Sequence, residues 1–106
     1  MKNYFVSLYQ VLKVVELASY QENTYSYQNF FDLEKLQLTE KELNIIIRNA
    51  VTEKLVTGIA LIEGFGFKVI VPQLTTAGYE FLENNSQMKQ AYKILKEIKG
   101  WIPGMN

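Results

Sequence analysis

Residues 38–74 read LTEKELNIIIRNAVTEKLVTGIALIEGFGFKVIVPQL, and this stretch decides the fold. Its first half carries apolar residues at three- and four-residue spacing, which predicts a helix from Thr39 to about Lys54. The letters TEKE are a helix-start signature, in which Thr39 caps the helix and Glu42 reaches back to it. The apolar face of this helix consists of Leu43, Ile46, Ile47, Ala50 and Val51.

The second half of the stretch changes from helical to extended periodicity. Two β-branched runs flank Gly64-Phe65-Gly66, and this pattern predicts a two-stranded β-hairpin. We expect Pro72 to end the second strand, because proline cannot donate a hydrogen bond within a sheet. A two-stranded sheet is not stable alone, so we expect the apolar side of the hairpin to pack on the helices.

Two helices are expected before this stretch. Residues 4–20 carry an apolar face at helical spacing, with Gln10, Lys13 and Glu16 on the opposite face. A short helix follows at about residues 29–36, and a turn separates it from the helix that Thr39 caps. The apolar face of the first helix consists of Leu8, Val11, Leu12 and Val15.

Helical periodicity returns after the hairpin. Thr75 or Thr76 caps a helix that Asn84-Asn85-Ser86 breaks or bends, and residues 87–99 are helical again. Gly78 lies inside the first of these helices, where glycine costs about 1 kcal/mol relative to alanine. A close approach of this helix to the hairpin would explain the glycine, because a Cβ would not fit.

The order of these elements predicts the architecture. A short helix, a three-residue turn and a second helix form a helix-turn-helix unit, and a hairpin directly after the second helix is a wing. We therefore predict an α+β fold, a winged helix-turn-helix with a two-stranded wing and C-terminal helices. A chain of 106 residues has room for one such core, so we expect a single winged-helix domain over residues 1–106.

The composition excludes several classes of function. The 11 basic and 11 acidic residues give a formal charge of zero, so no overall field attracts nucleic acid or an anionic membrane. The chain has no Cys and no His, which removes thiol nucleophiles, disulfides and the common metal ligands. We therefore expect no enzyme, no catalytic residue, no cofactor, no metal and no small-molecule substrate.

The apolar runs of the sequence are short, which indicates where in the cell the protein is expected. None is long enough to span a membrane, and the N-terminal MKNYFVSLYQ lacks the pattern of a signal peptide. We expect a cytoplasmic protein without a membrane partner.

The C-terminal third resembles a known family. The motifs L-T-x-x-G-x-x-F-L-E-N-N and A-Y-K-x-x-K-E-I-K-x-W-I, within residues 74–102, resemble the signature of the YjcQ-like proteins. These are small winged-helix proteins of Gram-positive bacteria and their phages, so the resemblance implies the same fold and a phage or prophage setting. It implies no catalytic residue, ligand or activity. The chain departs from the family in a tyrosine-rich loop, residues 20–27.

Polar residues of the Thr39 helix are candidates for DNA contact, because this helix of a winged helix enters the major groove. Their side chains are able to bind base edges or phosphates, whereas Glu40 and Glu42 would repel phosphate. The candidate DNA-binding residues are Lys41, Asn44, Arg48, Asn49 and Thr52, with Lys68 on the wing.

A basic stripe is expected on the last helix. Residues 86–106 carry a charge of +3 and the other residues carry −3, so the charge is segregated. The stripe is either an auxiliary phosphate contact or a solvated face. It consists of Lys89, Lys93, Lys96 and Lys99.

The wing tip and the last helix also offer apolar groups. Phe65 either folds back onto the core or is exposed for a protein contact. The helix is long enough to pair with a second copy, which makes a homodimer a candidate assembly. The residues of this candidate partner surface are Phe65, Tyr92, Leu95 and Trp101.

Two functions therefore stay open. The first is a DNA-binding or transcription-regulatory domain that binds double-stranded DNA, which the order of elements favours. The alternative is a non-enzymatic protein–protein interaction module, a homodimer or a host-factor binder. Zero net charge and the uncharged wing tip favour this alternative.

Overall fold

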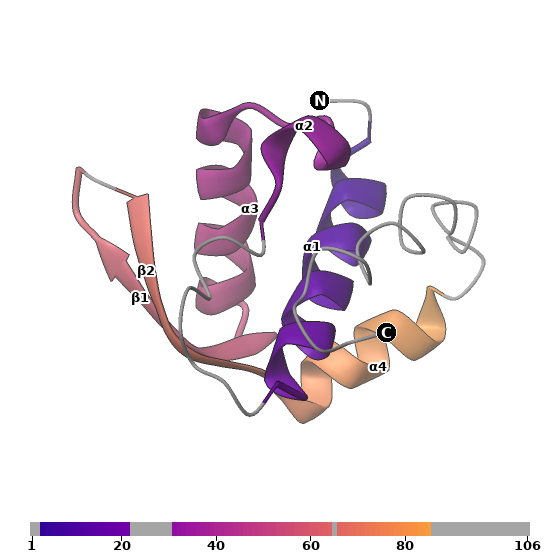
Figure 1. The fold of residues 1–106 in the computed structure, drawn as a ribbon. Coiled ribbons are helices and arrows are strands. Elements are labelled where there is room, and N and C mark those ends of the chain that lie inside the picture. The colour runs from indigo at the N-terminus through magenta and orange to yellow at the C-terminus, as the bar shows by residue number, and fades with distance from the viewer. Residues whose placement is uncertain (1–2, 22–30, 65, 86–106) are drawn as a thin grey trace.

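The computed structural model describes residues 3–21, 31–64 and 66–85, and Figure 1 shows their arrangement. Four helices and a two-stranded antiparallel sheet follow one another in the order α1, α2, α3, β1, β2, α4. The fold is therefore α+β, and this arrangement is compatible with a winged helix. None of the helices in these ranges is long and apolar enough to cross a membrane.

Helix α1, Tyr4–Ser19, confirms the helix predicted from periodicity, and it lies at the centre of the molecule (Figure 1). Asn3 caps it, with its side chain accepting hydrogen bonds from the backbone of Phe5 and Val6. Its fully buried residues include Val11, Leu12, Val14 and Val15. Because α3, α4 and the sheet all contact α1, it is buried on more sides than one amphipathic face provides.

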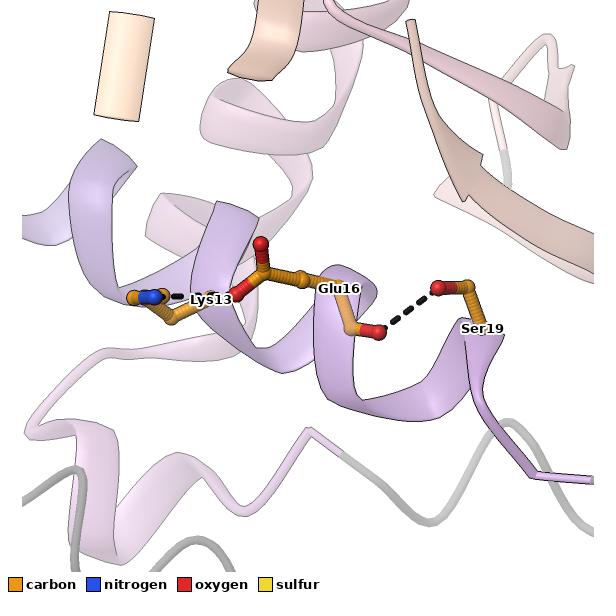
Figure 2. Close-up of polar contacts among 3 residues, drawn as sticks. All are labelled: Lys13, Glu16 and Ser19. Carbon is orange, nitrogen blue, oxygen red and sulfur yellow. Dashed lines mark hydrogen bonds and ion pairs between the residues drawn. The ribbon is translucent and has the colours of Figure 1, made fainter. Parts of the chain in front are cut away.

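The polar side of α1 differs from the sequence prediction in one residue. Lys13 and Glu16 form a half-buried ion pair of 2.9 Å, and the Ser19 hydroxyl donates to the Glu16 carbonyl (Figure 2). Gln10, which we expected on this polar face, is instead fully buried. The prediction was wrong because it assumed one apolar stripe for a helix that has neighbours on several sides.

Helix α2 is a single turn, Leu33–Leu36, capped by Asp32. The prediction placed its start near residue 29, and among the described residues the helix begins later. Three residues join it to α3, Glu40–Thr52, and the first of them, Gln37, adopts a left-handed conformation with φ of 57°. Both halves of the expected Thr39–Glu42 capping box are present, so the prediction of this helix start is confirmed.

Strands β1, Val56–Ile62, and β2, Gly66–Leu74, form the expected hairpin. The register shifts between Thr57 and Ile59, which pair with Gln73 and Val69, so β2 carries the extra residues of a bulge. Pro72 lies in this bulge, inside β2. The prediction that Pro72 ends the strand was wrong, because both strands of a two-stranded sheet are edges and a bulge tolerates a missing N–H.

Two close backbone approaches fix the hairpin, one between its own strands and one to α4. A Cβ on Gly58, which has φ of +76°, would overlap the Val71 carbonyl across the bulge. A Cβ on Gly78 would overlap the Leu55 carbonyl just before β1, which confirms the close approach inferred from a glycine inside a helix. Gly78 belongs to α4, Thr76–Asn84, whose N-cap is Thr75 as expected.

The core lies between α1, α3 and the base of the hairpin. Ile46, Ile47 and Ala50 of α3 are fully buried against α1, and Val56, Ile59 and Leu74 close the core from the sheet. Leu36, Leu38 and Leu82 extend it toward α2 and α4. The hairpin thus packs its inner face on the helices, as an isolated two-stranded sheet must.

Candidate nucleic-acid interface

The outer face of α3 is the part of the molecule that positions the predicted DNA-binding residues. Lys41, Arg48 and Thr52 are exposed. At 3.6 residues per turn these three side chains lie within about 40° of one another around the helix. The capping box and the buried isoleucines fix the direction in which they point, because both hold α3 in place against the core.

Asn49 lies at one side of this outer face. Its side-chain amide donates a hydrogen bond of 3.1 Å to the hydroxyl of Tyr4 on α1. The side chain is half-buried and already has a partner. The structure therefore places Asn49 as a link between α3 and α1, and the outer face begins beyond it.

Asn44 lies at the other side, toward the hairpin. A Cβ on Gly66, the first residue of β2, would lie 2.9 Å from the Asn44 side-chain oxygen. Asn44 therefore packs against the backbone of the wing, with part of its surface covered. The structure separates the five predicted α3 residues into an exposed central group and two asparagines at its margins.

The hairpin lies beside α3 (Figure 1). Lys68 is exposed and pairs with Ala60 across the sheet, on the face turned away from the core. Glu63 at the end of β1 is also exposed. Among the described residues, the wing therefore contributes one positive and one negative charge.

The hairpin also carries exposed apolar side chains. Ile70 is 54% exposed and Val71 is 50% exposed, and Ile62 is exposed to a lesser degree. An exposed apolar cluster of this kind is typical of a surface that contacts another molecule.

Acidic groups adjoin both ends of α3. Glu40 is exposed in its first turn, and Glu53 is exposed at its C-cap, next to Lys54. Glu42 is engaged by its hydrogen bond from the Thr39 backbone N–H, at 2.9 Å. The positive charge that faces outward is therefore carried by Lys41 in the first turn and by Arg48 in the second half of the helix. Within residues 3–21, 31–64 and 66–85, no three carboxylates gather closely enough to hold a metal ion.

Several predicted residues lie outside the described ranges. These are Phe65 at the wing tip, the C-terminal helix over residues 87–99, its basic stripe Lys89, Lys93, Lys96 and Lys99, and the partner-surface residues Tyr92, Leu95 and Trp101.

Ile45 is a residue of the outer face that sequence reasoning missed. It is 42% exposed, although its neighbours Ile46 and Ile47 are fully buried. The signal was present in the sequence: three consecutive isoleucines on a helix span about 200°, which one apolar stripe does not accommodate. Because Ile46 and Ile47 bracket the core direction, Ile45 points away from it.

The fold and the exposed α3 face define a small α+β protein compatible with the winged-helix class. The chain belongs to the YjcQ protein family, which matches it over residues 9–101. No curated protein and no solved structure showed a significant match to the chain. The resemblance carried by the two C-terminal motifs is thus confirmed at the level of the family.

Proposed function

We propose that this protein is a non-enzymatic DNA-binding domain of the winged helix-turn-helix type, in which α3 enters the major groove of double-stranded DNA. One observation carries the proposal: the outer face of α3 presents Lys41, Arg48 and Thr52 to solvent, while its inner face is fully buried. A helix anchored in this way, with a hairpin beside it, supports the proposal, because helix-turn-helix proteins dock such a helix in the major groove.

The charges on α3 suit a groove-binding helix with few phosphate contacts. Arg48 lies in the second half of the helix, where its guanidinium group can bind the edge of guanine with two hydrogen bonds. Lys41 and Lys68 would contact phosphates along the groove. Because only a few cations take part, the domain relies on base contacts more than on a strong electrostatic term.

Binding of the full chain to a pool of mixed-sequence duplexes, followed by fluorescence anisotropy at about 50 mM salt, tests the proposal. We expect wild-type binding and at least a fivefold loss for Arg48→Ala, since one good base contact is worth about 1–3 kcal/mol. Lys13→Ala is the matched control, because it also removes one positive charge but lies on α1 in an ion pair with Glu16. Absence of binding at this salt, or equal losses in both variants, would contradict the proposal.

A second candidate function is self-association through the outer face of the hairpin. The exposed Ile70 and Val71 favour it, because a two-fold contact between copies brings the same patch together and buries it twice. Sedimentation equilibrium tests this function. We expect a wild-type dimer that Ile70→Lys converts to a monomer, with Lys68→Glu as a control for the change of charge; a monomeric wild type would exclude it.

A further inference from the structure

An exposed aliphatic side chain occupies the outer face of α3 among polar neighbours. Ile45 is 42% exposed, and Lys41, Arg48 and Thr52 surround it at helical spacings of four, three and seven residues. Around the helix it lies about 60° or less from each of them. Ile45 does not belong to the buried core, which Ile46 and Ile47 reach on the other side of the helix. It is therefore available to an external apolar group.

We propose that Ile45 contacts the C5-methyl group of a thymine in the major groove, and that it makes the protein selective for duplexes with thymine at one fixed position. The inference rests on the proposed DNA-binding function and deepens it. Thymine methyl is the apolar group that base edges present in the major groove, and aliphatic side chains contact it there. The flanking Lys41 and Arg48 are both positively charged, which suits the negative potential of a DNA groove.

The spacing on α3 also relates this thymine to a second base. Arg48 follows Ile45 by three residues, a rise of about 4.5 Å along the helix, and successive base pairs are about 3.4 Å apart. The two side chains therefore reach base pairs that are one or two steps apart. Since arginine binds guanine most specifically, the ligand is a duplex in which a thymine lies within one or two base pairs of a guanine.

The test removes the methyl group and nothing else. A duplex that the full chain prefers is selected from a random pool, and each thymine in turn is replaced by uracil, which keeps the base pair and lacks the C5-methyl. Anisotropy titrations then compare wild type with Ile45→Ala, Ile45→Val and Ile70→Ala. Ile70→Ala is the matched control, because Ile70 is equally aliphatic and exposed but lies on the hairpin.

We expect uracil at one position to weaken wild-type binding about fourfold, which is the effect of losing one buried methyl group. Ile45→Ala should bind the thymine and uracil duplexes equally, whereas Ile45→Val and Ile70→Ala should keep the wild-type preference. Wild-type binding that is the same for thymine and uracil at every position would overturn this inference and leave DNA binding intact. A preference that survives in Ile45→Ala would overturn it too, and failure to bind any duplex would overturn both proposals.

Discussion

The side-chain amide of Asn49 donates a hydrogen bond of 3.1 Å to the hydroxyl of Tyr4, and this bond joins α3 to the first turn of α1. The two residues are 45 positions apart in the chain, so the bond is a tertiary one. It lies at the edge of the α3 outer face, on the side where α3 packs against α1. Its two partners can be removed separately, which makes its contribution measurable.

We expect Asn49→Ala and Tyr4→Phe each to lower the free energy of unfolding by about 1 kcal/mol, as a typical hydrogen bond contributes. The double variant should lose less than the sum of the two, because the pair shares one interaction. Urea denaturation of the four proteins measures this coupling. Tyr4→Phe should leave DNA affinity unchanged; additive losses would show that the two side chains act independently.

A buried amide offers a stabilising substitution. Gln10 is fully buried, and its side chain has no hydrogen-bond partner among the residues that the structure describes. A buried polar group without a partner costs about 1–3 kcal/mol. We expect Gln10→Met, which conserves volume, to raise the free energy of unfolding by about 1 kcal/mol in urea denaturation. Gln10→Glu should lower it, and a destabilised Met variant would show that the amide has a partner.

The capping box at the start of α3 predicts a second stability effect. Thr39→Ala removes the acceptor of the Glu42 backbone N–H and should cost about 1 kcal/mol of stability. Thr39→Ser keeps a hydroxyl in place and is the matched control. Thermal denaturation should show a lower Tm for the alanine variant alone. Equal Tm values for both variants would indicate that the cap contributes nothing measurable.

Alanine substitutions at two hairpin glycines separate the cost of a strained backbone conformation from the cost of a steric clash. Gly58 and Gly64 have φ of +76° and +80°, so alanine is strained at both. A Cβ on Gly58 would overlap Val71, while a Cβ on Gly64 would meet nothing within 4 Å. We expect Gly64→Ala to cost about 1 kcal/mol and Gly58→Ala at least about 2 kcal/mol more, measured by urea denaturation. Similar losses of stability in the two variants would contradict the close approach of Gly58 to Val71.

The few cations near α3 predict a weak salt dependence of the proposed DNA binding. With contacts from Lys41, Arg48, Lys54 and Lys68, the slope of log K against log salt should be about −2 to −4 per protomer. Lys41→Ala should reduce its magnitude by about one. Anisotropy titrations at several salt concentrations measure the slope. A much steeper slope would require phosphate contacts from residues outside the described ranges.

The sequence predicted those features that depend on neighbouring residues. The start of α3 follows from Thr39 and Glu42, which interact across one turn. The two strands follow from β-branched runs on either side of a glycine turn, and Gly78 indicated a close approach before its partner was known. These interactions are local or reflect a steric requirement on one residue, so composition and spacing are enough to reveal them.

Tertiary structure decided the features that depend on what packs against each residue. Gln10 was expected in solvent and is buried, because α1 has neighbours on several sides. Pro72 lies inside β2, because the register of the hairpin places it in a bulge. Packing places Asn44 and Asn49 at the margins of the outer face, Asn44 against the hairpin and Asn49 bonded to Tyr4.

The outer face of α3 combines both kinds of information. The sequence by itself determined that a capped amphipathic helix lies there and that Lys41 and Arg48 are on its polar side, because a period of 3.6 residues fixes which side chains share a face. Only the tertiary structure decided which surfaces pack at the edges of that face, and with it that Asn44 and Asn49 are partly covered while Ile45 is exposed. The physical reason is that a side chain is buried only where a second surface packs against it. The periodicity of one helix describes its own surface and not the surface that covers it.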